Sequence, residues 1–146
     1  MATPPLIFVL NGPNLNLLGT REPEIYGSQT LDDIARQLVA KADELGVELD
    51  IRQSNHEGHL IDWLHEARAK GAKAVIINPG GYSHTSVALH DAVKAIGTPV
   101  IEVHLSDPET RESFRHTDLV AMAASRVIKG KGAGGYLLAL DEAARL

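Results

Sequence analysis

Three short apolar runs rich in β-branched residues divide the chain. They span Leu6–Leu10, Ala74–Asn78 and Pro99–Val103, and each ends in a polar or glycine-rich stretch. Runs of this length without polar alternation are typical of strands that are buried on both faces of a parallel sheet. A weaker run at Val47–Arg52 predicts another strand, and Leu119–Ala124 is the candidate for a fifth.

The segments between these strands carry apolar residues at helical spacing. One stripe contains Leu31, Ile34, Ala35, Leu38, Ala42 and Leu45, and a second contains Leu60, Ile61, Leu64 and Ala67. The predicted boundary signals are capping pairs at the helix starts and glycines at the helix ends: Thr30 with Asp33, Ser54 with Glu57, Gly46 and Gly71. A C-terminal helix is predicted from about Gly135 to Leu146.

This alternation of strands and helices predicts an α/β fold. It implies a parallel sheet with helices on both faces, joined by right-handed crossovers. No linker, internal repeat or low-complexity tract interrupts residues 1–146, so we expect a single domain. Ligands of such sheets bind where loops leave the carboxyl ends of the strands, which selects residues 11–27, 53–58, 78–85 and 104–115.

Composition narrows the functional classes. Apolar residues make up 44% of the chain and charged residues 23%, with a formal net charge of -5. The positive residues are scattered, so nucleic-acid binding is not expected. The absence of cysteine excludes a thiolate nucleophile, a disulfide framework and a cysteine-based metal site. The first apolar run lacks the basic start and length of a signal peptide, so we expect a cytoplasmic protein that does not span a membrane.

The loop after the first strand is long for this fold class and resembles a movable lid. It covers residues 11–27, with Gly19 and Gly27 bracketing its second half. Tyr26 becomes a candidate base if Arg21 stabilises its phenolate. Unit charges ~4 Å apart at an effective dielectric of ~20 attract by about 4 kcal/mol, which equals roughly three pKa units before desolvation is subtracted. In the alternative interpretation Tyr26 packs on the domain and Arg21 pairs with a neighbouring glutamate.

The third strand leads into a glycine pair and a helix that is expected to begin near Ser83. Gly80 and Gly81 permit tight turns that would expose backbone N–H groups to an anion. The segment has neither a Walker lysine nor a GxGxxG spacing, so a nucleotide site is not expected. His84 and Asp91, placed on one side of that helix, could bind ligand hydroxyls, although capping and surface pairing explain each equally well.

The fourth strand ends in a candidate general acid. Glu102 and His104 point to the same face because strand residues alternate, and a carboxylate there would hold the imidazole ring and favour its charged form. In the alternative interpretation His104 is merely hydrogen-bonded. Asp107 and Pro108 predict a short helix that leaves Ser106 and nearby N–H groups available to a carboxylate.

Two other kinds of site are less compatible with the sequence. His56, His59 and His65 could be considered metal ligands, but two of them flank a helix start and no HExxH pattern is present, so no metal is expected. A serine hydrolase of the α/β type would need a GxSxG elbow, which the chain lacks.

Taken together, the motifs strongly resemble those of the type II 3-dehydroquinate dehydratases. The resemblance covers nearly the whole chain. Its most specific parts are NGPNLNLLGTREPEIYG, QSNHEGHLIDWL, INPGGYSHTSVALHDA and IEVHLSDPETRESFRH, in the order and at the spacing of the family. Residues 117–135 follow the family pattern only loosely.

The resemblance implies a role for each matched residue. Tyr26 would remove the C2 proton of the substrate with Arg21 lowering its pKa, while His104, held by Glu102, would protonate the departing C1 hydroxyl. The other implied contacts are a water-positioning Asn14, a carboxylate site at Asn78, Leu105 and Ser106, and groups for the ring hydroxyls at His84, Asp91 and Arg115. Asp91 is implied to act across a subunit boundary.

The resemblance also implies a complete function. The expected protein is a flavodoxin-like three-layer sandwich with a five-stranded parallel sheet of order 2-1-3-4-5, assembled as a homododecamer, a tetramer of trimers. It would convert 3-dehydroquinate to 3-dehydroshikimate through an enolate, without cofactor or metal, in the shikimate pathway or in quinate breakdown. The alternatives are a catalytically silent binding module for a small anion or polyol, and a metal-dependent lyase.

Overall fold

Five parallel strands form the centre of the fold in this computed structural model, which describes residues 3–20, 22–26 and 28–146. The strand order in the sheet is β2-β1-β3-β4-β5, with every neighbouring pair parallel. The strands are β1 (Leu6–Asn11), β2 (Glu48–Gln53), β3 (Ala74–Asn78), β4 (Val100–His104) and β5 (Arg126–Lys129). The predicted sheet and its order are therefore confirmed.

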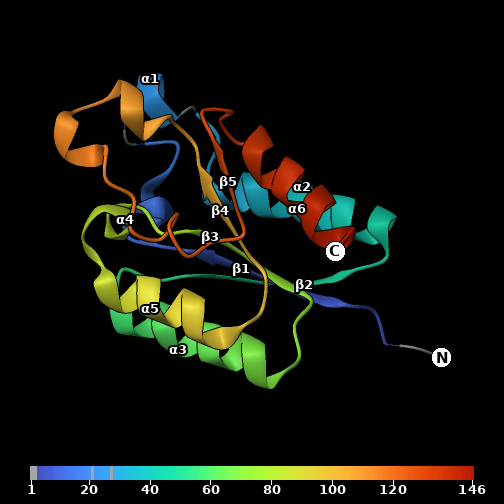
Figure 1. The fold of residues 1–146 in the computed structure, drawn as a ribbon. Coiled ribbons are helices and arrows are strands. Elements are labelled where there is room, and N and C mark those ends of the chain that lie inside the picture. Colours follow the sequence, from blue (N-terminus) through green and yellow to red (C-terminus); the bar gives the residue numbers. More distant parts are fainter. Residues whose placement is uncertain (1–2, 21, 27) are drawn as a thin grey trace.

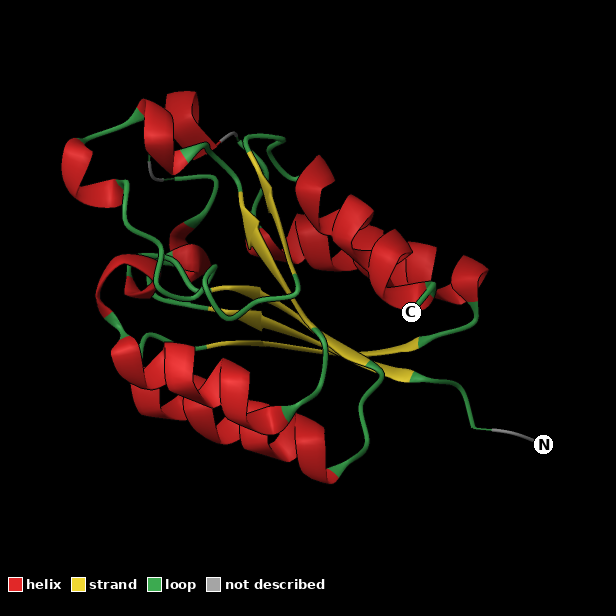
Figure 2. Ribbon diagram, in the orientation of Figure 1, coloured by secondary structure: helices red, strands yellow, loops and turns green. Residues whose placement is uncertain are grey.

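Four helices cover the two faces of this sheet. Helices α2 (Leu31–Leu45) and α6 (Gly134–Ala144) lie on one face, and α3 (Glu57–Ala69) and α5 (Val87–Ile96) lie on the other (Figures 1 and 2). This is the predicted three-layer sandwich. Shorter elements occupy the loops: η1 (Leu15–Leu17), α1 (Pro23–Tyr26), α4 (Tyr82–Thr85), η2 (Pro108–Thr110) and η3 (Ser113–Arg115). No helix among the described residues is long and apolar enough to cross a membrane.

Strand alternation divides the interior into two cores. On β1, Ile7 and Val9 pack towards α2 and α6, whereas Phe8 and Leu10 pack towards α3 and α5. All four side chains are fully buried. Because both faces of the central strands are covered, the sequence of β1 reads as an unbroken apolar run.

The predicted helix boundaries are correct at α2 and partly wrong at α3. Thr30 and Asp33 form the reciprocal capping box, and Gly46 closes the helix with φ 72°. At α3 the N-cap is His56, whose side chain makes no capping bond. Ser54 instead accepts a hydrogen bond from the His56 N–H at 3.0 Å, and Glu57 accepts one from the Ser86 hydroxyl. The Ser54–Glu57 capping box is therefore wrong, because Ser54 bonds to His56 and His59 and Glu57 bonds to Ser86 on another helix.

The fifth strand lies further along the chain than predicted. Residues 119–124 form turns, with the Ala123 and Ala124 N–H groups both bonded to the Val120 carbonyl at 3.0 Å. The strand itself is β5, which pairs with β4 alone and is therefore an edge strand. An edge strand needs less apolar surface than a central one, so Arg126–Lys129 carries little of the signal that marks β1, β3 and β4.

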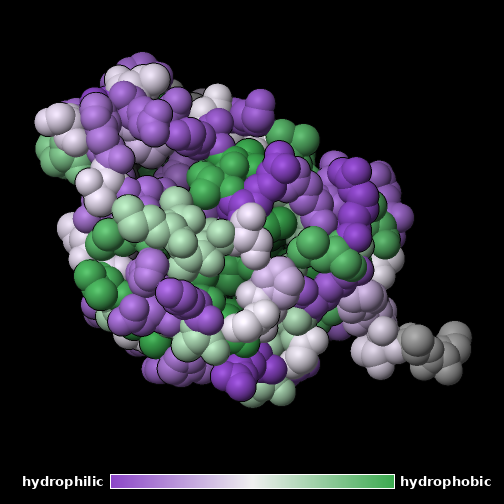
Figure 3. Space-filling view, in the orientation of Figure 1, coloured by the Kyte–Doolittle hydropathy of each residue, from purple (hydrophilic) through white to green (hydrophobic). Residues whose placement is uncertain are grey.

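The carboxyl ends of β1, β3 and β4 meet at one edge of the sheet. The segments that follow these strands, η1 with α1, α4, and residues 105–118, gather at this edge (Figure 1). On the face seen in Figure 3, the end of the molecule that carries α1 and residues 105–118 is mainly hydrophilic, while apolar groups lie over the middle. The polar segments chosen from the sequence thus converge in space.

Candidate active site

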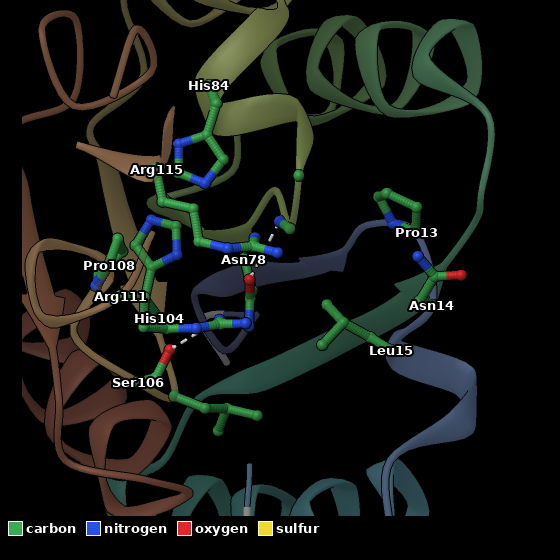
Figure 4. A pocket seen from close by; sticks show the side chains of 13 residues that line it. Pro13, Asn14, Leu15, Asn78, His84, His104, Ser106, Pro108, Arg111 and Arg115 are labelled. Carbon is green, nitrogen blue, oxygen red and sulfur yellow. Dashed lines mark hydrogen bonds between the residues drawn. The ribbon is translucent and has the colours of Figure 1, made fainter. Parts of the chain in front are cut away.

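A small pocket of about 200 Å³ opens at this edge of the sheet. Pockets for drug-sized ligands usually measure about 300–1,000 Å³, so this one suits a small molecule. The described residues that line it are Pro13, Asn14, Leu15, Asn78, Gly80, Gly81, His84, His104, Leu105, Ser106, Pro108, Arg111 and Arg115 (Figure 4). The structure therefore brings together seven of the residues singled out in the sequence, namely Asn14, Asn78, His84, His104, Leu105, Ser106 and Arg115.

The two sides of the pocket differ in chemistry. In Figure 4, His84, His104, Ser106 and Arg115 lie on one side, and the Pro13–Leu15 segment lies on the other, with Asn78 between them. Asn14 adopts φ 69°, a left-handed conformation that is uncommon for a residue other than glycine. Its N–H donates to Asn55 Oδ1 at 3.0 Å, which fixes the loop at this point.

Asn78 is held by a buried network that the sequence did not predict. The Tyr136 hydroxyl, from α6, donates to Asn11 Oδ1 at 2.7 Å and accepts from Asn78 Nδ2 at 2.9 Å. Asn78 Oδ1 also accepts from the Gly80 N–H at 3.2 Å. Burial raises the pKa of Tyr136 above its ordinary value, so the phenol stays neutral. The amide of Asn78 is thus oriented from two sides before any ligand binds.

The turn after β3 differs from the prediction. Its backbone N–H groups are largely used within the turn, since Tyr82, Ser83 and His84 each donate to the carbonyl oxygen three positions earlier. The chain then forms two helices rather than one, because Ser86 interrupts α4 and caps α5. The expected single helix is therefore wrong, whereas anion binding at the glycine pair, which lines the pocket, stays a prediction.

His84 and Asp91 consequently sit on different helices. His84 faces the pocket, and its Nδ1 lies 2.7 Å from the Thr117 carbonyl oxygen. Asp91 is exposed on α5 and does not line the pocket of its own chain. A role for Asp91 in a neighbouring subunit stays a prediction.

His104 lies in a compact cluster of ionisable groups. Its Nε2 is hydrogen-bonded to Glu102, as the strand alternation predicted, and lies 3.2 Å from Asp118 Oδ2. Asp118 was missed because it lies 14 residues further along, in a segment without regular structure. Glu102 is fully buried and His104 nearly so.

The pKa values of the cluster diverge. Burial is the main reason that the pKa of Glu102 is raised, and its neighbour Asp118 raises it further. Burial alone would lower the pKa of His104, but hydrogen bonds to Asp118 and Glu102 outweigh it and raise the pKa. Burial likewise opposes ionisation of Asp118, yet hydrogen bonds from its neighbours lower its pKa to about 2. The favoured state at neutral pH is an imidazolium, an ionised Asp118 and a neutral Glu102.

The same three residues are the one cluster in the described part of the chain with a metal-like spacing. Their ligand atoms lie within 4.8 Å of one another. However, His104 offers the same atom, Nε2, to both carboxyl groups. A nitrogen that donates a hydrogen bond carries a proton and has no free lone pair for a metal. Hydrogen bonding therefore accounts for the arrangement.

Two arginines give one side of the pocket a positive character. The Arg111 guanidinium donates to Ser106 Oγ at 3.3 Å, and Arg115 pairs with Glu112 while lying 4.9 Å from the Phe114 ring centroid. Arg111 was not singled out in the sequence, although it lies within a segment selected as a strand-end loop. The predicted cap of η2 is confirmed, with Asp107 accepting from the Glu109 N–H and Pro108 opening the turn.

The predicted lid lies only partly within the described residues. Arg21 and Gly27 are outside them, and so is the side chain of Tyr26, whose backbone belongs to α1. Ile25 of α1 lines a second hollow together with Ser106, Asp107 and Thr110. Helix α1 therefore lies against the segment that follows β4, close to the edge of the pocket.

Comparison with known proteins agrees with this fold. Residues 5–144 match the family described as Dehydroquinase class II. The chain belongs to the class II dehydroquinases. A 3-dehydroquinate dehydratase from Phenylobacterium zucineum is 61% identical over 140 residues, covering 96% of each chain. The resemblance inferred from the sequence is therefore confirmed.

Solved structures of the family share the fold. The crystal structure of a type II dehydroquinase from Butyrivibrio crossotus has a TM-score of 0.95 at 38% identity and covers 97% of this chain and 99% of its own. That of the type II dehydroquinase from Propionibacterium acnes has a TM-score of 0.93 at 42% identity, covering 100% and 99%. Membership of the family thus extends over sequence, topology and the whole length of the chain.

Proposed function

We propose that the protein eliminates water from 3-dehydroquinate to give 3-dehydroshikimate through an enolate intermediate. The observation that carries the proposal is a pocket that places His104, Asn78 and Arg115 together in a dehydroquinase chain. The reaction removes a proton from C2 and hydroxide from C1, so it requires a base, a group that stabilises the enolate oxygen, and an acid.

Tyr26 is the proposed base. A phenol has a pKa near ~10 and removes a proton effectively at neutral pH only if its anion is stabilised. Arg21 is proposed to supply the positive charge, five residues earlier in the same loop. Placement of α1 against the segment after β4 is consistent with a lid that brings Tyr26 to the pocket. Asn14, on the opposite side of the pocket, is proposed to position the water that stabilises the enolate.

His104 is the proposed acid for the departing hydroxyl. Its hydrogen bonds to Glu102 and Asp118 both run through Nε2. In the imidazolium this leaves the Nδ1 proton for transfer, after which the ring is neutral and the hydroxyl leaves as water. A raised pKa keeps His104 charged at neutral pH and so keeps this proton in place.

The remaining pocket residues are proposed to hold the substrate. Asn78, with the backbone at Leu105 and Ser106, would bind the carboxylate, and Arg111 adds positive charge beside Ser106. His84 and Arg115 would bind ring hydroxyls. The mechanism uses no cofactor or metal, so activity is expected to survive exhaustive chelation, whereas a metal-dependent lyase would lose it.

We further propose that the protein works as a cytoplasmic homododecamer, a tetramer of trimers, with Asp91 entering the site of a neighbouring subunit. Asp91 is exposed, and the large apolar side chains of Val87 and Phe114 are 60% and 66% exposed in the single chain. Surfaces of this kind suit a protein interface. Light scattering should give a mass twelve times that of the 15.7-kDa chain.

The alternative, a silent binding module, differs from the proposal at Tyr26. Incubation of the purified protein with 3-dehydroquinate should produce the absorbance of the conjugated enone. A Tyr26→Phe variant should lose roughly 10²–10⁴ of kcat, because it retains the ring but not the ionisable oxygen. A Tyr82→Phe variant is the matched control. Full activity in Tyr26→Phe would exclude the proposed base, and inactive wild-type protein would favour the binding module.

A further inference from the structure

Hydrogen bonds to its carboxylate and to the flanking backbone hold Asp118 in place. Its Oδ1 accepts from the Ala121 N–H at 2.9 Å, which leaves Oδ2 for His104 at 3.2 Å. The flanking backbone is anchored as well. Leu119 N–H donates to the Ser83 carbonyl at 2.7 Å, and the His84 and His90 rings bond to the carbonyl oxygens of Thr117 and Leu119 at 2.7 and 2.6 Å. The carboxylate is therefore held against His104 by α4 and α5.

Glu102 is the less suitable partner for a positive charge. It is fully buried, and its Oε1 has no hydrogen-bond partner among the described residues. An ionised carboxylate spreads its charge over both oxygens, so ionisation would leave half a charge buried and unsatisfied. A neutral carboxyl leaves only a carbonyl oxygen there. Asp118 has both of its oxygens bonded and remains partly accessible to solvent, which favours its ionisation.

We infer that Asp118 is a positioning residue that supplies the negative charge for the His104 imidazolium, while Glu102 orients the ring as a neutral hydrogen-bond partner. The inference deepens the proposed function, because it rests on His104 being the acid. Asp118 does not touch the proposed substrate position, since it is absent from the pocket lining. It would act through His104 by keeping the ring protonated at a pH where a free imidazole has lost its proton.

Other charged groups near His104 do not replace this contribution. Most of those that face the site are cationic and disfavour the imidazolium, so they make an anionic partner more necessary. Glu112 and the Asp107–Glu109 pair are occupied by Arg115 and Lys129 respectively. The groups that face His104 from its own strand and from the elements around it are Glu102, Asp118, His84, Arg111 and Arg115, with Lys129 on the neighbouring strand β5.

The test replaces Asp118 with asparagine, which keeps the shape and an oxygen for the Ala121 N–H but removes the charge. In this variant, the pH at which kcat falls on the alkaline side of its profile should be lower by roughly one to three units. The titration of the His104 ring, followed by NMR and assigned with a His104→Asn variant, should move by the same amount. In Glu102→Gln the shift should be clearly smaller, because a neutral amide replaces a neutral carboxyl. Asp141→Asn, which removes a carboxylate from the 2.7 Å pair with Lys41 between α2 and α6, is the control and should not shift either curve.

Three outcomes would overturn the inference. The first is a wild-type His104 ring that is neutral at pH 7. The second is a Glu102→Gln shift as large as, or larger than, that of Asp118→Asn. The third is an Asp118→Asn variant that melts at a lower temperature but retains the wild-type His104 titration, which would indicate a structural role alone. The NMR titration needs no turnover, so it decides the role of Asp118 even if the wild-type protein fails to dehydrate 3-dehydroquinate. If Asp118→Asn does not fold, the His104 titration can be compared between wild type and Asp118→Ser to decide the role of Asp118.

Discussion

Two buried hydrogen-bond networks stand at the carboxyl ends of adjacent strands, and they differ in charge. Asn11, Asn78 and Tyr136 form a neutral network at the ends of β1 and β3. Glu102, His104 and Asp118 form an ionisable one at the end of β4. Both are buried and both reach the same pocket, the first through Asn78 and the second through His104.

This difference in charge gives the two networks different tasks, since one fixes the geometry of the site and the other supplies a proton. Amides do not titrate and burial raises the pKa of Tyr136, so the neutral network keeps its shape across the working pH range. In the ionisable network each proton affects the others, because charges interact strongly where water is scarce. We infer that the first network mainly orients substrate and that the second decides whether a proton is available.

The largest expected effect comes from removing the titrating group itself. His104→Ala should lower kcat by roughly 10²–10⁴, the usual contribution of a positioned acid. His65→Ala, at an exposed position on α3, is the control. Steady-state kinetics with 3-dehydroquinate would measure the change. Retention of kcat within tenfold of wild type would contradict the assignment of His104 as the acid.

A substitution in the neutral network should change the stability of the protein and its binding of substrate, but not the pH dependence of kcat. Tyr136→Phe leaves Asn11 Oδ1 and Asn78 Nδ2 without their buried partner, which should cost about 1–3 kcal/mol of unfolding free energy and raise KM. The alkaline side of the kcat profile should stay where it is. Tyr82→Phe, which loses a 2.7 Å bond to the Asn55 carbonyl in an exposed setting, should cost less. A shifted pH profile in Tyr136→Phe would show that the two networks are coupled.

The smallest effect concerns stability in acid. The pKa of Asp118 is lowered from 3.8 to about 2. Its ionised form therefore contributes stability that is fully present above pH ~4 and is lost as the pH falls through about 2. After allowance for solvent screening, the contribution is about 1 kcal/mol. Denaturant unfolding of wild type and Asp118→Asn should differ by this amount at pH 6 and by less at pH 3, whereas the cost of Tyr136→Phe should be equal at both. An Asp118→Asn difference that grows towards pH 3 would refute the sign.

The neutral and ionisable networks also differ in how far the sequence revealed them. Glu102 and His104 were found because they are two residues apart on a strand, and alternation alone puts them on one face. Asn78 was found from the family motif, but its partner Tyr136 lies 58 residues away on a helix that reads as an ordinary apolar segment. Asp118 was missed for a similar reason, since residues 119–124 were expected to form a strand and instead form turns.

Short-range signals in the sequence were sufficient to predict most of the helices and strands. Apolar runs defined the central strands, helical spacing defined α2 and α3, and Thr30 with Asp33 defined a helix start. These signals act over a few residues and so are legible in the chain. The edge strand β5 and the break at Ser86 could not be predicted from local signals. The first depends on the position of the strand in the sheet, and the second involves a hydrogen bond from Ser86 to Glu57 on another helix.

The sequence by itself determined the central strands and the edge at which the pocket forms, and through the family resemblance it gave the strand order and the identity of most groups that line the pocket. Only the tertiary structure decided that Asp118 stands against His104, what holds Asn78, and that Asp91 does not line the pocket of its own chain. The physical reason is that hydrogen bonds and charge interactions depend on distance and burial in space. Those two quantities are set by chain segments that lie far apart in the sequence.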